Sequence, residues 1–240
     1  MPASEKDRAE FHTPEHRDVS GGWLRPAVFG AMDGLVTNVS LIAGVGGGGG
    51  SQHVILLTGF AGLAAGAFSM AAGEFVSVSS QNELVHAEVD KERHELAHNA
   101  ASEQAELVGM LRRRGISAAT ARLAAAEISA HPEQALTVHA IEELGVNPTE
   151  LPSPYVAAGA SLVAFAAGAI IPLLPYALGF DALEVALGLS ALAAVAGGGL
   201  VSRLTDRPFW RGALRQLVLG ALAAGITYLI GLAVGGIATG

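Results

Sequence analysis

Acidic side chains recur at helical spacing in one polar stretch, residues 80–153, which we call the insert. Glu88, Glu92 and Glu95 fall at i, i+4 and i+7, on one face of a helix, and Glu103 and Glu106 repeat an i, i+3 pair. With a later group, the candidate metal ligands are Glu88, Glu92, Glu95, Glu103, Glu106, His139, Glu142 and Glu143. Stacked carboxylates repel one another, so they need solvent, Lys or Arg partners, or a bound cation. The pattern leaves open a solvated helix face and a site for Mg²⁺, Mn²⁺, Fe²⁺ or Zn²⁺, which oxygen ligands with an occasional imidazole suit.

A second set of polar groups lies inside apolar stretches. Asp33 and Glu74 occupy neighbouring stretches, and ionisable groups within a membrane span are costly and usually face a pathway or a partner. On adjacent antiparallel helices Asp33, Met70 and Glu74 fall at similar depth. Two carboxylates and a thioether could hold a borderline divalent cation briefly, which favours a transport path. The alternative is an Asp33 that hydrogen-bonds within a helix bundle and a Met70 that fills the core.

The amino-acid composition indicates which class of protein carries these groups. Of 240 residues, 51% are hydrophobic and 15% are charged, whereas a soluble domain is usually about 25% charged. This excludes an ordinary soluble globule and a disordered chain. The net charge of -8 argues against nucleic-acid binding. The absence of Cys excludes disulfides, thiolate zinc sites, iron–sulfur clusters and thiol catalysis.

Five apolar stretches are long enough to span a membrane, at about 25–46, 54–79, 155–176, 182–202 and 213–236. All 14 Lys and Arg lie before or at the start of the first stretch, between the second and third, or between the fourth and the first turn of the fifth. Alternating spans put these three segments on one side, which the positive-inside rule makes cytoplasmic. The N-terminus is then inside and the C-terminus outside.

The sequence thus predicts an all-α membrane protein with five transmembrane helices and a cytoplasmic helical metal-binding insert between spans two and three. The predicted domains are a polar cytoplasmic tail (1–22), transmembrane helices 1–2 (23–79), the metal-binding domain (80–153) and transmembrane helices 3–5 (154–240). Within the insert we expect helices over 80–98, 103–114 and 118–145, with a stop at Gly115, a cap at Ser117 and a break near Pro132.

Three glycine pairs at i, i+4 could bring spans close together: Gly30 and Gly34, Gly62 and Gly66, and Gly231 and Gly235. The alternative explanation is plain glycine abundance, since the chain has 31. Pro172 and Pro175 are expected to kink the third span.

An enzyme is the less favoured alternative. Glu83-x-x-His86 and Glu95-x-x-His98 match the Glu-x-x-His element of di-iron bundles. Such a site needs its two motifs on different helices, and these two are expected to share one. No nucleotide-binding, HExxH or GxSxG motif is present.

Two membrane motifs resemble the vacuolar iron transporter family: GAMDGLVTNVSLIAGV at 30–45 and GAFSMAAGEFVSVSSQNE at 66–83. The resemblance covers residues about 20–240. It implies a dimeric carrier that moves Fe²⁺, often also Mn²⁺, out of the cytosol against protons. It places Asp33 and Met70 on the path and makes the insert a metal-binding domain, with the matching carboxylates Glu92, Glu95, Glu103, Glu106 and Glu143.

The chain departs from the plant members of that family at two places. Gly62 stands where a plant member has a membrane Glu, and Glu74 is expected to take over part of that role. His139 and Ala140 replace a Met pair near Glu143. These changes bear on the ligand set and on the metal preference.

Three functions follow from these patterns. The leading one is a proton-coupled Fe²⁺ and Mn²⁺ transporter, with Zn²⁺ or Co²⁺ as further cargo, no resident cofactor and no enzymatic activity. The others are a membrane-bound ferroxidase-like enzyme and a metal-sensing membrane scaffold. We expect a homodimer in a prokaryotic plasma membrane, with metal ions, protons and the lipid bilayer as partners and no nucleic acid.

Overall fold

A computed structural model describes residues 22–238, and this part of the chain contains helices and no strand. The predicted polar tail (1–22) lies outside the described residues except for Gly22, as do the last two residues.

Five helices are long and apolar enough to cross a membrane, as the sequence predicts. They are α1 (Leu24–Gly47), α2 (Gln52–His98), a third helix built from α6 (Pro154–Ile170), the 3-10 turn η3 (Ile171–Leu173) and α7 (Leu174–Ala177), then α8 (Leu183–Leu204) and α9 (Phe209–Ala238). The break in the third helix coincides with Pro172 and Pro175, because proline removes a backbone donor and crowds the preceding turn. α2 has 47 residues, which corresponds to about 70 Å, far more than a bilayer core needs.

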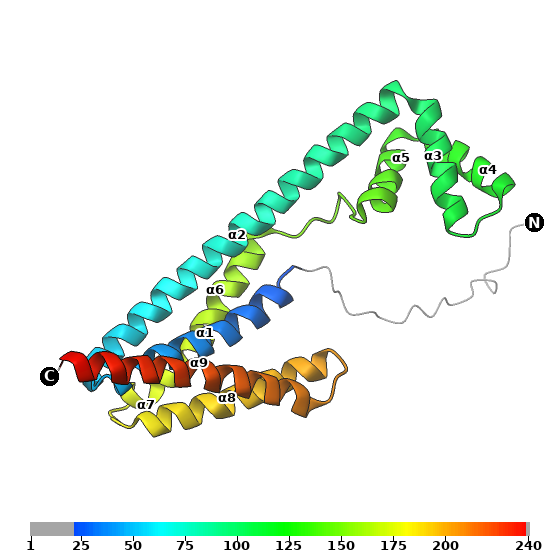
Figure 1. The fold of residues 1–240 in the computed structure, drawn as a ribbon. Coiled ribbons are helices and arrows are strands. Elements are labelled where there is room, and N and C mark those ends of the chain that lie inside the picture. The colour runs from blue at the N-terminus through cyan, green and yellow to red at the C-terminus, as the bar shows by residue number, and fades with distance from the viewer. Residues whose placement is uncertain (1–21, 239–240) are drawn as a thin grey trace, which may run out of the picture.

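The connections alternate between the two ends of the helix bundle (Figure 1). The start of α1, the insert and the α8–α9 turn lie toward one end, and the α1–α2 turn, α7 and the C-terminus lie toward the other. The arrangement agrees with the alternation inferred from the Lys and Arg positions. Both tryptophans, Trp23 and Trp210, are exposed at the basic end, where interfacial aromatics are typical of membrane proteins.

α1 is the central helix and packs against α6, α9, α2 and α8. Two of the predicted glycine pairs lie where backbones meet. A Cβ at Gly34 would overlap the carbonyl oxygen of Phe165 on α6, and a Cβ at Gly231 of α9 would overlap that of Gly44 on α1. Gly62 and Gly66 instead face side chains, of Leu41 and Phe165. The glycines therefore set how closely the helices approach, as in other membrane bundles.

Side-chain amides link these helices. Asn38 of α1 is 1% exposed and its Nδ2 donates to the carbonyl of Ala169 on α6. Gln52, at the start of α2, donates to the carbonyl of Tyr176 at 2.8 Å. Asn82 of α2 donates to the carbonyl of Pro152 at 2.9 Å and so ties the end of the insert to the helix from which it departs.

The insert consists of residues 80–98 of α2 and four short elements. These are α3 (Ala100–Arg113), α4 (Ala118–Ser129), α5 (Pro132–His139) and the π-helical turn η2 (Ala140–Leu144). The predicted boundaries are confirmed: Gly115 has φ +91° after α3, Ser117 Oγ accepts from the Thr120 amide at 3.3 Å, and Pro132 opens α5. The expected helix 118–145 is divided near Pro132 into α4 and α5, as predicted, and its last turn, η2, is π-helical, which was not predicted.

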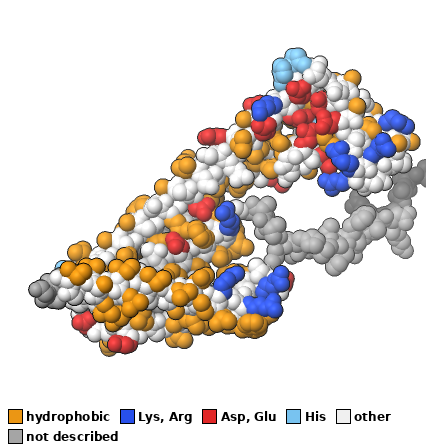
Figure 2. All heavy atoms as spheres, viewed as in Figure 1, with side chains coloured by type: hydrophobic (Ala, Val, Ile, Leu, Met, Phe, Trp, Pro, Cys, Tyr) orange, Lys and Arg blue, Asp and Glu red, His pale blue; other side chains and the backbone are white. Residues whose placement is uncertain are grey.

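Figure 2 shows the two parts of the molecule by their surfaces. Hydrophobic side chains cover the bundle, whereas acidic side chains gather on the insert. On α9 the exposed side chains are mostly apolar, such as Leu222, Leu229 and Ile237. Lipid contact accounts for this exposure in a membrane helix.

Candidate metal centre

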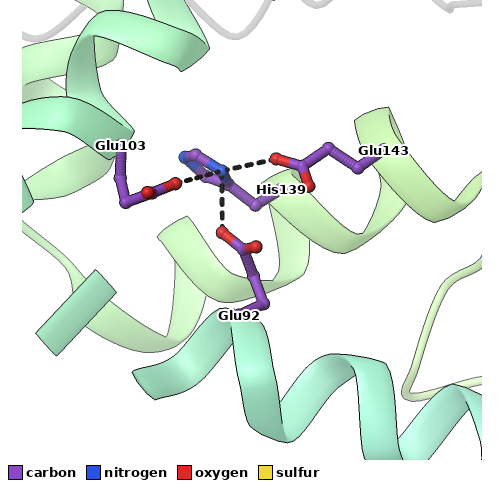
Figure 3. A group of neighbouring side chains, drawn as sticks. All are labelled: Glu92, Glu103, His139 and Glu143. Carbon is purple, nitrogen blue, oxygen red and sulfur yellow. Dashed lines mark hydrogen bonds and ion pairs between the residues drawn. The ribbon is translucent and has the colours of Figure 1, made fainter. Parts of the chain in front are cut away.

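Four elements of the insert bring four candidate ligands together (Figure 3). Glu92 comes from α2, Glu103 from α3, His139 from the end of α5 and Glu143 from η2. One ligand atom from each lies within 4.8 Å of the others. Within residues 22–238 this is the one group of three or more His, Asp or Glu side chains with that geometry.

Apolar packing holds these elements in register. Val89 of α2 packs with Leu136 and Ala140, which fixes α5 and η2 against α2. Leu107 and Met110 pack with Ala125, which fixes α3 against α4. Glu92 lies three residues after Val89, and Glu103 four residues before Leu107, so each ligand shares a helix face with a core residue. We call the four ligands the candidate metal centre.

His139 lies at the centre of the group. Its Nδ1 lies 3.1 Å from Glu143 Oε1, 3.0 Å from Glu92 Oε1 and 3.9 Å from Glu103 Oε2. The hydrogen bond is the one to Glu143, so Glu92 Oε1 is buried without a hydrogen-bond partner. His139 Nε2 is also buried without one, and the side chain is fully buried. Buried acceptors without a hydrogen-bond donor are costly, which fits a group built to bind a cation.

Burial also acts on the acids. The pKa values of Glu92 and Glu103 are raised first by desolvation. Negative charge raises them further, mainly from Glu143 at Glu92 and from Glu106 at Glu103, while His139 opposes the shift at both. A bound divalent cation would offset this repulsion. Carboxylate oxygens with one imidazole nitrogen suit Fe²⁺, Mn²⁺, Co²⁺ or Zn²⁺.

The other four candidates in the insert have different neighbours. Glu88 pairs with Lys91 at 2.6 Å, Glu142 pairs with Arg114 at 3.1 Å, and Glu95 accepts from Asn99 at 2.6 Å. Glu106 is exposed and acts on the centre through its charge. Glu88 and Glu95 still line a cavity of about 80 Å³ beside Glu92 and Glu143. The structure thus groups half of the predicted ligands and leaves the rest around them.

The predicted path residues are half-buried in the bundle. Asp33 Oδ1 lies 3.4 Å from the Thr37 hydroxyl, which donates to it one turn along α1. Met70 packs beside Ala67 and Phe165, as its core-filling alternative also requires. Asn38 Oδ1 is buried without a hydrogen-bond partner and lies 3.4 Å from where a Cβ on Gly62 would stand. Neither the missing hydrogen-bond partner of Asn38 Oδ1 nor its position beside Gly62 could be predicted from the sequence, because both depend on how α1 packs against α2.

The two Glu-x-x-His motifs share one helix, as expected. Glu83, His86, Glu95 and His98 all belong to α2, and all four are exposed. A di-iron site of the bundle type needs such motifs on facing helices. The arrangement gives no support to the ferroxidase-like alternative.

The raised pKa values predict a pH effect on stability. Between the ordinary glutamate pKa of 4.5 and the raised pKa values, the folded chain binds more protons than the unfolded chain. The free energy of unfolding therefore falls as pH rises through that window. We therefore expect the Tm of the metal-free protein, measured by circular dichroism with a chelator present, to increase from neutral pH to about pH 5. The Glu103→Gln variant should show a flatter profile. An identical profile for the variant would contradict this assignment.

Comparison with known proteins covers almost the whole described chain. Residues 24–232 match the VIT family. The chain is 35% identical over 224 residues to the vacuolar iron transporter of Acanthamoeba castellanii, covering 90% of this chain and 81% of that protein. It is 36% identical over 212 residues to vacuolar iron transporter homolog 3 of Arabidopsis thaliana (86% and 80%), and 35% identical over 213 residues to homolog 1 of Oryza sativa subsp. japonica (86% and 71%). Together with its five apolar helices, these matches show that the chain is an integral membrane protein of the VIT family.

Proposed function

We propose that the protein transports divalent metal, Fe²⁺ and also Mn²⁺, out of the cytosol in exchange for protons. Relatives named as vacuolar iron transporters support the iron. The donor set of the candidate metal centre supports both metals, because carboxylates with a single imidazole do not discriminate strongly between them.

One observation carries the proposal: a single continuous helix links the membrane to the candidate metal centre. α2 bears Met70 and Glu74 among the spans and Glu92 in the centre. Glu74 and Glu92 are 18 residues apart in sequence, which is about 27 Å along a helix. A metal collected by the insert is therefore held on the same rigid element that lines the proposed route.

In the proposed path, Asp33 and Glu74 supply carboxylates and Met70 a soft thioether. A carboxylate that binds the cation when ionised releases it when protonated, which couples metal movement to a proton gradient. The route also passes Asn38, whose buried Oδ1 is a further oxygen donor.

Sidedness and assembly belong to the same proposal. The basic end of the bundle faces the cytosol of a prokaryotic cell, so the insert collects metal there. Two copies form a homodimer, and a large part of α2 is available for the contact, since exposed apolar side chains such as Phe60, Phe68 and Val76 follow it. Light scattering that found only monomers in mild detergent would contradict the dimer.

The test is metal uptake into proteoliposomes under a pH gradient. We expect Fe²⁺ and Mn²⁺ flux from the wild type and at least a tenfold loss for Asp33→Asn, which keeps the shape and removes the charge. Asp181→Asn, at an exposed position outside the spans, is the matched control and should retain flux. Full transport by Asp33→Asn would refute the path.

The same preparation separates the alternatives. Oxygen consumption on adding Fe²⁺, without flux, would favour a ferroxidase-like enzyme. Metal binding without flux or oxygen consumption would favour a sensor or scaffold.

A further inference from the structure

The far face of α2 carries a second set of metal-ligating side chains that the candidate metal centre does not use. His86, Asp90, His94 and His98 follow one another at intervals of four residues, so they form one stripe along the helix. All four are exposed. Val89, Glu92 and Leu96, which belong to the core or to the centre, lie on the other side of the helix.

Two residues of this stripe have their rings in contact. The imidazole rings of His94 and His98 are stacked, with centroids 4.0 Å apart and planes 28° from parallel. In the space-filling view, histidine side chains stand at the tip of the insert, clear of other elements (Figure 2). At this separation a rotation about the outer side-chain bond suffices to turn two ring nitrogens toward one cation.

A backbone contact fixes the tautomer of one ring. His98 Nδ1 lies 2.8 Å from the carbonyl oxygen of His94. A carbonyl only accepts, so Nδ1 carries the hydrogen and Nε2 keeps its lone pair. A ring nitrogen held by a backbone carbonyl, with the other nitrogen free, is the usual state of a histidine ligand.

The acidic side chains beside these two histidines have other partners. Asp90, one turn before His94, is held by Arg93 at 2.7 Å. Glu95 accepts from Asn99. The pair therefore presents nitrogen donors, whereas the candidate metal centre presents mainly oxygen donors.

We propose that His94 and His98 form a second metal site, distinct from the candidate metal centre, that binds Zn²⁺, Ni²⁺ or Cu²⁺ in preference to Mn²⁺ and Fe²⁺. Imidazole pairs follow the order of affinity that rises from Mn²⁺ to Cu²⁺. Water completes the coordination, because the site is open to solvent. A metal ion bound to both rings cross-links the last turn of α2, immediately before Asn99, which joins α2 to α3.

The experiment is calorimetric titration of the full detergent-solubilised protein with Ni²⁺. To isolate the site, the titration is done in a Glu103→Gln, Glu143→Gln background that weakens the candidate metal centre. We expect this variant to bind one Ni²⁺ through His94 and His98, and addition of His94→Ala and His98→Ala to weaken that binding at least tenfold. His131→Ala, another exposed histidine of the insert, is the matched control and should leave it unchanged.

A spectroscopic readout identifies the ligands directly. With Cu²⁺ bound, electron paramagnetic resonance should show coupling to imidazole nitrogen, which disappears in His94→Ala, His98→Ala. Equal Ni²⁺ affinity with and without the two histidines would overturn the proposal. Neither readout depends on flux, so the site and the transport function can fail separately.

Discussion

Replacing Glu103 with glutamine is expected to weaken binding of Mn²⁺ to the protein by about 100-fold and, at the same time, to stabilise the metal-free fold. Loss of even an outer partner of a metal ligand typically costs about 10–100-fold in affinity, and a direct carboxylate ligand falls at or beyond the upper end. Stabilisation follows because the ionised side chain is buried, which raises its pKa, and the neutral amide avoids that penalty. The measurements are calorimetric titration with Mn²⁺ and the Tm at neutral pH with a chelator present.

The opposite signs of the two effects make the prediction specific. A residue that only supported the fold would lose stability together with metal binding. Glu127→Gln is the matched control, because Glu127 is an exposed glutamate of the same insert on α4 and should change neither quantity. Unchanged Mn²⁺ affinity in Glu103→Gln would remove this carboxylate from the centre.

The helices and their order could be predicted because their signals are local. Apolar length identifies the spans, the positions of Lys and Arg identify the ends, and turn residues such as Gly115 and Ser117 act within a few residues of themselves. The division between α4 and α5 could be predicted in the same way, because Pro132 favours the first turn of a new helix.

The ligand set of the insert depends on packing and could be predicted only as a larger group. Spacing puts Glu88, Glu92 and Glu95 on one face of α2, yet only Glu92 lies where α3 and η2 converge. Arg114 holds Glu142 away, and its approach from the end of α3 to η2 has no counterpart in the linear sequence. The π-helical turn that carries Glu143 is likewise invisible to periodicity.

The glycine pairs admit two explanations from the sequence, abundance and close packing, and Gly34 of α1 lies against the backbone of α6. Replacing Gly34 with valine is expected to destabilise the protein by about 3 kcal/mol, because added side-chain carbons would overlap the backbone of Phe165 on α6. Backbone on both sides of the contact leaves no flexible side chain that could move aside. α1 and α6 would have to separate, and α1 is the helix on which the rest of the bundle packs.

The measurement is the Tm in detergent, with size-exclusion chromatography to detect aggregation. A loss of about 3 kcal/mol in a chain of this size lowers Tm by about 10 °C. Gly159→Val is the matched control: Gly159 also lies in a spanning helix, but a Cβ there meets nothing within 4 Å. A Tm for Gly34→Val equal to that of Gly159→Val would mean that the α1–α6 contact is loose enough to admit a side chain, and close helix packing would then not explain the glycines of this bundle.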